Sequence, residues 1–380
     1  MTLFALPEDQ IAVRDMARDF AAERIAPHAL DWDARKHFPV DVLREAASLG
    51  MGGITLREEH GGSGLTRLDA ALIFEALATG CPTVSAYLSI HNMAAGMIDR
   101  FGSEEQRARW LPGLCRMDLL AAYCLTEPGA GSDAASLRTS ARRDGDAYVL
   151  NGTKQFISGA GAADLYVTMV RTGEPGPRGI STLVVPAGTP GLSFGENERK
   201  MGWNAQPTRQ VVFEECRVPA ANRLGQEGIG FKIAMAGLDG GRLNIAACSL
   251  GGAQSALDRT LAYLAERRAF GQRLDAFQAL QFRLADMATE LEAARVMLYA
   301  AAASLDRGDP DATQRSAMAK RFATDTGFRV ANEALQLHGG YGYLSEYGIE
   351  KIVRDLRVHQ ILEGTNEIMR LIVARGLVRP

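Results

Sequence analysis

Glu363 lies in the segment Ile361-Leu362-Glu363-Gly364, between two apolar residues and a glycine. Apolar neighbours exclude water from a carboxylate, which raises its pKa and makes it a stronger base. A base of this kind is needed to take a weakly acidic proton from a carbon next to a carbonyl. The competing interpretation is that Glu363 caps a helix expected at residues 367–375 and closed by Gly376, as acids near helix starts often do. Taken alone, the capping interpretation is favoured.

A glycine-rich segment, residues 123–133, could hold a second group. Gly129 and Gly131 let backbone N–H groups approach a ligand closely, and the hydroxyls of Thr126 and Ser132 can give directional hydrogen bonds. The segment lacks the lysine of a phosphate-binding P-loop and the parallel-strand context of a dinucleotide fingerprint. A plain glycine-rich turn is the alternative.

Four further segments combine aromatic, cationic and glycine residues. Residues 156–159 (Phe-Ile-Ser-Gly) end an expected strand with an aromatic beside a hydroxyl, which suits stacking on a flat heterocycle. Residues 267–271 (Arg-Arg-Ala-Phe-Gly) follow a helix, residues 336–342 interrupt another, and residues 239–242 set a cation beside two glycines. Each also has a plain interpretation as a turn or surface charge.

Bulk composition is that of an ordinary globular chain of two or three domains. The 380 residues are 47% hydrophobic and 23% charged, with a net charge of −3 and a pI of about 6.1, so no general affinity for nucleic acid or anionic membranes is expected. Histidine spacing predicts no metal site, and the chain is expected to be cytoplasmic. The apolar run at residues 3–6 is too short for a membrane span and is followed by acids, so we expect neither a leader nor membrane insertion. Five dispersed cysteines favour a reducing compartment: Cys81, Cys115, Cys124, Cys216 and Cys248.

The chain divides into three stretches with different sequence periodicity. Residues 1–118 have helical periodicity, with a capping box expected at Ser103 and Gln106. Residues 119–228 consist of short β-type runs, including a hairpin turn predicted at Asn151-Gly152, and indicate an antiparallel barrel or sandwich. Helical periodicity then returns to the end of the chain. One seam suits bundle packing: Leu280, Leu284, Met287, Leu291, Ala294 and Leu298.

Together these segments resemble the acyl-CoA dehydrogenase family over essentially the whole chain. The resemblance is carried by residues 126–133, 267–271, 339–340 and 362–365, in that order and spacing. It implies an α+β multidomain fold with an N-terminal helical domain (1–118), a central antiparallel β-barrel (119–228) and a C-terminal four-helix bundle (229–380). It also implies a homotetramer with one FAD per subunit, an acyl-CoA substrate and electron-transferring flavoprotein as the acceptor.

The resemblance also implies individual contacts. Phe156 and Ser158 stand where the family often has Trp and Thr, so an aromatic face and a hydroxyl remain. Some of the FAD contacts are implied to cross a subunit interface. The implied FAD contacts are Tyr123, Leu125, Thr126, Gly131, Ser132, Phe156, Ile157, Ser158, Arg267, Phe270, Phe277, Gln278, Gln336, Leu337, Gly339, Gly340, Thr365, Asn366 and Glu367. The implied acyl-CoA contacts are Ser132, Asp239, Gly240, Gly241, Arg242 and Arg375, and no metal is implied.

Glu363 matches the family's usual catalytic base. Some branches place the base immediately before the arginine that matches Arg242; here that position is Gly241, which cannot take a proton. The expected reaction is α,β-dehydrogenation of an acyl-CoA thioester. In this family, hydrogen bonds from the base's backbone N–H and the ribityl chain of the flavin stabilise charge on the thioester oxygen.

Residues 200–209, with 239–250 and 359–367, resemble the branch that acts on isobutyryl-CoA in valine breakdown, forming methacrylyl-CoA. Short-chain or 2-methylbutyryl activity stays open, because one methylene in an apolar pocket discriminates by only about 1–3 kcal/mol. Residues 200–209 could line the pocket or serve a docking or structural role. Two other classes are alternatives: an acyl-CoA oxidase, whose chain is usually much longer, and a DNA-binding non-catalytic relative, which carries extra basic residues at its C-terminus.

Overall fold

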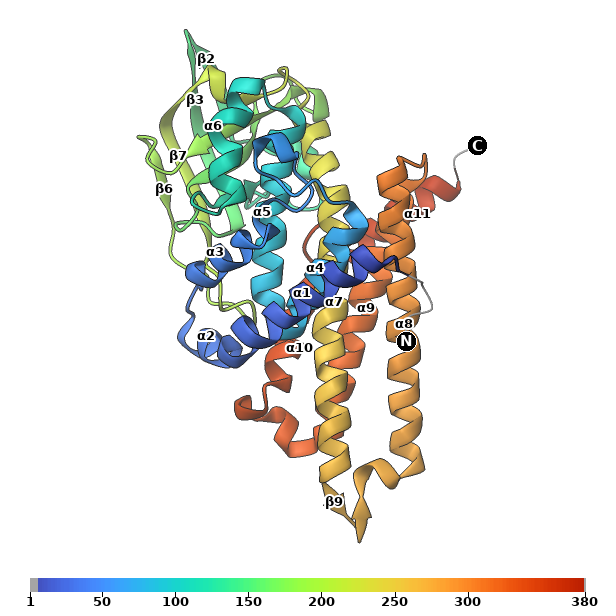
Figure 1. The fold of residues 1–380 in the computed structure, drawn as a ribbon. Helices are drawn as coiled ribbons and strands as arrows, with labels where there is room; N and C mark the ends of the chain where they lie inside the picture. The colour runs from blue at the N-terminus through green and yellow to red at the C-terminus, as the bar shows by residue number, and fades with distance from the viewer. Residues whose placement is uncertain (1–5, 379–380) are drawn as a thin grey trace.

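In the computed structural model, which describes residues 6–378, the β-sheet lies at one end of the molecule and the long C-terminal helices extend away from it (Figure 1). The run at residues 3–6 therefore falls, except for Leu6, outside the described residues. The element order is helices, strands and helices, so the predicted three-part fold class is confirmed. The domain boundaries stay a prediction.

The N-terminal helices supply the inner wall against which the rest of the chain packs. Side chains of α4 and α5 are buried on nearly all faces, so both are core helices. The predicted capping box is confirmed: Ser103 Oγ accepts from the Gln106 N–H, and Gln106 Oε1 accepts from the Ser103 N–H. The helices are α1 (Glu8–Phe20), α2 (Ala29–Arg35), α3 (Val40–Ser48), α4 (Arg67–Gly80), α5 (Pro82–Phe101) and α6 (Glu104–Cys115).

The central sheet follows the strand order β6-β7-β3-β2-β4-β5-β8, with β1 beside β4. Most pairings are antiparallel, as predicted, but β1 pairs with β4 in parallel and β2 meets β4 in a single parallel bridge. The strands are β1 (Ala121–Cys124), β2 (Ser140–Asp144), β3 (Ala147–Ser158), β4 (Leu165–Arg171), β5 (Ile180–Pro186), β6 (Leu192–Phe194), β7 (Thr208–Pro219) and β8 (Arg223–Leu224).

The hairpin predicted at Asn151-Gly152 is wrong. Strand β3 runs straight through these residues, and the turn between β2 and β3 is at Gly145 (φ +61°) instead. Asn151 and Gly152 form an irregularity in the β3–β7 ladder, where Asn151 exchanges two hydrogen bonds with Glu215. Gly152 has φ +145°, and a Cβ there would meet Thr139 at 2.6–2.9 Å, so the glycine serves a bulge within a strand.

Three long helices dominate the C-terminal part: α7 (Gly230–Glu266), α8 (Gln278–Arg307) and α9 (Ala312–His338). They run side by side in Figure 1 and contact one another. The shorter helices are α10 (Ile349–Arg357) and α11 (Asn366–Leu377), and the strands β9 (Arg268–Ala269) and β10 (Gln272–Arg273) form a hairpin after α7. Gly376 lies inside α11, so the predicted stop at that residue is wrong.

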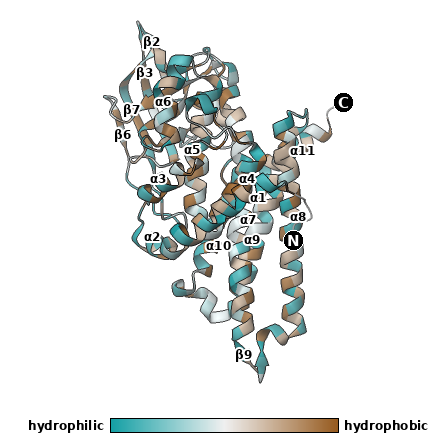
Figure 2. Cartoon of the chain, viewed as in Figure 1, coloured by the Kyte–Doolittle hydropathy of each residue, from teal (hydrophilic) through white to brown (hydrophobic). Residues whose placement is uncertain are grey.

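The predicted seam of α8 holds the bundle together. Met287, Leu291, Ala294 and Leu298 are buried, and Leu280 and Leu284 pack against the same core. Figure 2 shows mixed hydropathy along the long helices. Within residues 6–378, no helix is long and apolar enough to cross a membrane.

Candidate active site

Glu363 lies in a short loop between η11 (Val358–Gln360) and α11. The cap of α11 is Thr365, whose Oγ1 accepts from the Ile368 N–H at 3.3 Å, so the capping interpretation of Glu363 is wrong. Glu363 and Gly364 both have left-handed backbone, with φ +56° and +85°. A non-glycine residue in this region costs about 1–3 kcal/mol and persists only where its surroundings enforce it. The chain therefore holds Glu363 in a strained conformation that aims its side chain.

The Glu363 carboxyl faces α7 at Gly241. A Cβ built on Gly241 would lie 2.5 Å from Glu363 Oε2 and 2.8 Å from the sulfur of Met93 on α5. No side chain could be added at 241 without displacing one of these groups. The absence of a side chain at Gly241 therefore provides the space that the Glu363 carboxyl occupies. Positions 241 and 363, which carry the base in different branches of the family resembled, thus lie side by side.

The Glu363 carboxyl is poorly solvated. Its Oε2 is buried and has no hydrogen-bond partner among the described residues. Burial raises the pKa of Glu363 to about 7, although the positive charges of Arg242 and Lys320 act to lower it. A carboxyl whose pKa lies near neutral pH is suited to act as a general base.

Arg242 holds the backbone of the Glu363 loop. Its guanidinium is 4% exposed, its Nη1 bonds Asp239 Oδ1 at 2.6 Å, and its Nε lies 3.5 Å from the Glu363 carbonyl oxygen. Thr313 donates a further hydrogen bond to Asp239 at 2.9 Å. Arg242 is therefore paired with Asp239, and it acts on the Glu363 carboxylate through its charge.

Tyr123 on β1 brings a second unpaired group to the same place. Its hydroxyl is buried without a partner among the described residues, and burial, with the charge of Glu363 next, raises the pKa of Tyr123 well above its usual value. An unsatisfied buried polar group costs about 1–3 kcal/mol. Two such groups close enough to interact electrostatically fit a bound ligand that would pair with them.

The loop after β1 is fixed by a buried ion pair. Glu127 accepts hydrogen bonds from Lys154 Nζ (2.8 Å) and from the N–H groups of Arg138 (2.6 Å) and Thr139 (2.9 Å). The Gln155 N–H donates to the Thr126 carbonyl at 2.8 Å. This loop carries four of the expected FAD contacts: Leu125 is buried, Thr126 is half-buried, and Gly131 and Ser132 are exposed.

Phe156 is presented to the surface by a bulge in β3. The β3–β7 register shifts between Lys154 and Ile157, Phe156 has φ +59°, and its side chain is 64% exposed. Bulges beside functional sites commonly re-aim one side chain. Ile157 is buried, while Ser158 is half-buried and accepts from Gln206 Nε2 at 3.4 Å. The strand thus offers an open aromatic face beside a hydroxyl.

Most of the remaining expected FAD contacts lie at the other end of α7. Phe270 is 94% exposed at the β9–β10 turn and meets Phe277 edge to face at 6.3 Å, and Arg267 lies over the Tyr341 ring at 5.2 Å. Gly241 and Arg267 are 26 positions apart on one helix axis, which corresponds to roughly 40 Å. The chain therefore does not bring these residues to Glu363 (Figure 1). The others at that end are Gln278, Gln336, Leu337, Gly339 and Gly340.

The residues that follow Glu363 divide into two groups. Asn366 is 3% exposed, and its side chain bonds Lys320, Thr324 and Asp325 within the chain. Glu367 is exposed, as is Arg375 farther along α11. Asn366 therefore joins the start of α11 to α9, a structural role that was not predicted from the sequence.

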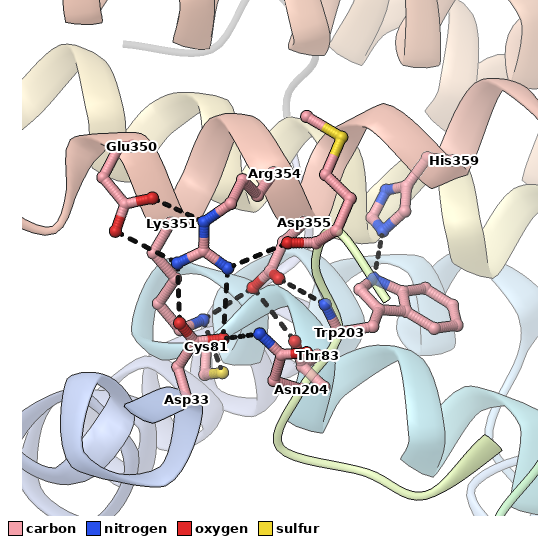
Figure 3. Close-up of polar contacts among 11 residues, drawn as sticks. Asp33, Cys81, Thr83, Trp203, Asn204, Glu350, Lys351, Arg354, Asp355 and His359 are labelled. Atoms are coloured by element: carbon pink, nitrogen blue, oxygen red, sulfur yellow. Dashed lines mark hydrogen bonds and ion pairs between the residues drawn. The ribbon is translucent and has the colours of Figure 1, made fainter. Parts of the chain in front are cut away.

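Residues 200–209 dock against α10. The Trp203 N–H donates to Asp355 Oδ1 at 2.7 Å, and its indole Nε1 donates to His359 Nε2 at 3.1 Å (Figure 3). Because indole only donates, the proton of His359 is on Nδ1, which lies 2.6 Å from Ser249 Oγ. Burial lowers the pKa of His359 to about 3, so the ring is neutral. Trp203 is 4% exposed.

Charged and polar side chains add further bonds at the contact between residues 200–209 and α10. Arg354 pairs with Asp33 at 2.6 Å and also donates to the Met201 carbonyl, and Asn204 bonds Asp33 at 3.1 Å (Figure 3). A Cβ on Gly202 would lie 2.5 Å from the Arg354 backbone. These contacts favour the structural interpretation of residues 200–209, because they tie the sheet to α10 and to the segment that leads to Glu363.

Sequence reasoning missed Lys320 and Met93. Lys320 is fully buried, and its Nζ donates to the carbonyl of Gly364 at 2.8 Å. A signal was present, because Lys320 falls on the buried stripe of α9 with Ser316, Ala323 and Gly327. A lysine at such a spacing is rarely buried without a specific partner.

Comparisons with known proteins agree with this geometry. Residues 7–118, 122–216 and 228–378 match family models described as the N-terminal, middle and C-terminal domains of acyl-CoA dehydrogenase. Mitochondrial isobutyryl-CoA dehydrogenase of Bos taurus is 57% identical over 374 residues, covering 98% of this chain and 90% of the relative.

Solved structures are similar throughout. Butyryl-CoA dehydrogenase from Megasphaera elsdenii superposes with a TM-score of 0.96 at 40% identity, covering 99% of this chain and all of that one. A chain in a structure described as the electron transferring flavoprotein of Acidaminococcus fermentans has a TM-score of 0.97 at 41% identity, with 99% and 100% coverage.

Proposed function

The chain belongs to the acyl-CoA dehydrogenase family, and on that premise we propose that it oxidises isobutyryl-CoA to methacrylyl-CoA, a step of valine breakdown. The observation that carries the dehydrogenase chemistry is the Glu363 carboxyl, which is buried over Gly241 with a pKa near 7. Members of the family bind FAD. The unpaired Tyr123 hydroxyl, the exposed Phe156 ring and the glycine-rich loop after β1 fit that cofactor.

Glu363 takes the proton from the α-carbon of the acyl group. Its unpaired Oε2 is the atom available for this proton, and a pKa near 7 keeps about half of the carboxyl ionised at neutral pH. FAD, when bound, accepts the hydride that leaves the β-carbon. The left-handed backbone at Glu363 and Gly364 fixes the direction of the carboxylate, and orientation of this kind supplies much of the rate.

The thioester oxygen gains negative charge as the α-proton leaves. The Glu363 N–H donates no hydrogen bond within the described residues, so it is free to stabilise this oxygen. Asp239, Gly240, Arg242, Ser132 and Arg375 are proposed to contact the acyl-CoA. Gly241 leaves room for the Glu363 carboxyl, and Gly240 leaves room for the guanidinium of Arg67.

Isobutyryl-CoA is favoured over other short acyl-CoAs by the 57% identity to the bovine enzyme. Short-chain and 2-methylbutyryl substrates are the alternatives. Met93 lies beside Glu363 and Gly241, so its flexible side chain would bound the acyl end of the site.

The two separated groups of FAD contacts support an assembly. Because Phe270, Arg267 and Gln278 lie at the far end of α7 from Glu363, a second copy of the chain would have to supply them to the FAD held at Tyr123 and Phe156. A homotetramer with such shared sites is our proposal, and electron-transferring flavoprotein is the proposed acceptor. A cytoplasmic location stays a prediction, and the bovine relative is named as mitochondrial.

The test is anaerobic titration of the purified flavoprotein with isobutyryl-, butyryl-, 2-methylbutyryl- and isovaleryl-CoA, following loss of the oxidised-flavin absorbance. We expect the fastest bleaching with isobutyryl-CoA and methacrylyl-CoA as the product. Faster bleaching by another member of the panel would reassign the substrate. Absence of bleaching with all four, together with salt-sensitive retention on DNA, would favour a non-catalytic relative instead. Rapid reoxidation of the reduced flavin by air would favour an oxidase.

A further inference from the structure

Lys320 is a buried cation that the reaction above does not use. It lies on α9, is fully buried, and its Nζ donates to the Gly364 carbonyl at 2.8 Å and to Asn366 Oδ1 at 3.0 Å. No carboxylate is paired with it directly among the described residues. Burying an ammonium without a paired carboxylate is costly, so the position of Lys320 calls for an explanation.

The loop around Glu363 is attached to α9 at three points. Gln360 donates to Asp325 at 2.8 Å before the base, Gly364 accepts from Lys320 directly after it, and Asn366 bonds Thr324 and Asp325 at the start of α11. These bonds span the two residues with left-handed backbone. Strained backbone persists only when neighbouring groups enforce it, and α9 supplies those groups.

We infer that Lys320 is a positioning residue for the catalytic base. It holds the Glu363-Gly364 turn through its hydrogen bond to the Gly364 carbonyl, and its positive charge favours the ionised carboxylate of Glu363. This inference rests on the proposed dehydrogenation. Lys320 touches neither substrate nor reacting atoms and acts through Gly364 and the electric field at Glu363.

Several titratable groups lie near Glu363, and their charges determine how the pKa of Glu363 would change if Lys320 were removed. Arg242 on α7 and Lys320 on α9 both favour the ionised carboxylate, while burial opposes it. Tyr123 on β1 and Cys248 on α7 are also near, but burial raises the pKa of both thiol and phenol, so both stay neutral near pH 7.

The groups around Lys320 set its own charge. Burial lowers the pKa of Lys320 to about 7, against the opposing effects of Glu363, Asp325 and Glu367, so its ammonium is partly populated at neutral pH. His359 is neutral there. Neutralising Lys320 removes one of the two cations that stabilise the Glu363 carboxylate. The pKa of Glu363 must then rise, and the acid limb of the pH profile must move to higher pH.

The experiment uses the FAD-loaded enzyme and isobutyryl-CoA as the probe. The limiting rate of anaerobic flavin reduction is measured from pH 5.5 to 9 for wild type, Lys320→Met, Lys320→Arg and Thr324→Val. Thr324 is on α9, as is Lys320, and it is hydrogen-bonded to Asn366 at the start of α11. Thr324→Val removes this bond without changing the charge, so it is the matched control for loosening of the Glu363 loop.

We expect Lys320→Met to move the acid limb upward by half a pH unit or more and to lower the rate at pH 7 at least about twofold, because half a unit lowers the ionised fraction of Glu363 at pH 7 by that factor. Thr324→Val should leave the limb within 0.2 units of wild type. Lys320→Arg carries a permanent charge, so it should leave the limb in place or move it to lower pH, opposite to Lys320→Met. A Lys320→Met enzyme that binds FAD and keeps the wild-type limb would overturn the inference. Wild type that bleaches with none of the acyl-CoA panel would instead remove the proposed function.

Lys320→Gln keeps a donor for the Gly364 carbonyl without the charge and carries the same expectation if Lys320→Met does not fold. Failure of both neutral variants to yield flavin-loaded protein, while Lys320→Arg loads normally, would assign Lys320 to folding and would also overturn the positioning role.

Discussion

Replacing Glu363 with Gln should change how stability depends on pH. Burial raises the pKa of the carboxyl from its ordinary value of 4.5 to about 7 in the folded chain. The folded pKa is the higher one, so the unfolded chain releases this proton first as pH rises. The stability that the neutral acid provides is therefore fully present below pH 4.5 and is lost by about pH 7. Glutamine is neutral at every pH, so the variant has no pH-dependent loss of stability from residue 363.

The magnitude follows from the two pKa values. At about 1.4 kcal/mol per pKa unit, the stability of wild type relative to Glu363→Gln should fall by about 3 kcal/mol between pH 4.5 and pH 8. A 380-residue chain has an unfolding entropy of roughly 0.8 kcal/mol per degree, so this corresponds to a Tm difference of about 4 °C. The pKa of about 7 already includes the opposing charges of Arg242 and Lys320.

The assay is thermal unfolding of both FAD-loaded proteins from pH 4.5 to pH 8.5. Titratable groups that do not interact with residue 363 cancel in the comparison. We expect Glu363→Gln to gain in Tm over wild type as pH rises and to level off above pH 7. A Tm difference that does not change with pH would refute the reasoning, because it would mean that Glu363 is solvated like an ordinary surface acid.

Three further substitutions test separate parts of the site. Gly241→Ala places a Cβ 2.5 Å from Glu363 Oε2, so we expect at least a tenfold loss in the rate of flavin reduction with the far-UV circular dichroism unchanged; a wild-type rate would contradict the close approach. Phe270→Ala should weaken FAD retention and shift the assembly to smaller species on size-exclusion chromatography, and unchanged elution with full FAD content would argue against shared sites. Trp203→Phe removes the hydrogen bond to His359 and should lower Tm by a few degrees, corresponding to about 1–3 kcal/mol, whereas an unchanged Tm would make that bond dispensable.

Local patterns in the sequence predicted the order of elements well, because caps and periodicity act over a few residues. Ser103 and Gln106 form the expected box, and the seam of α8 faces the bundle. Asn151-Gly152 misled because the same pair suits a tight turn and a bulge, and the choice depends on the bond to Glu215, which is 64 positions away.

Glu363 was identified by its neighbours, but the reasons for its pKa were not visible in its own segment. They come from burial against Gly241 and from the opposing charges of Arg242 and Lys320, which are 122, 121 and 43 positions away and meet the loop only after α7 and α9 have packed. The bulge that exposes Phe156 is likewise set by pairing with β7. Contacts that span domains cannot be deduced from the spacing of residues in one stretch.

The most direct measurement is the limiting rate of anaerobic flavin reduction by isobutyryl-CoA in Glu363→Gln, measured beside wild type at pH 8. If Glu363 is the base, the variant will bind FAD and acyl-CoA but reduce its flavin about 10²–10⁴-fold more slowly. Reduction at close to the wild-type rate would show that another group takes the α-proton.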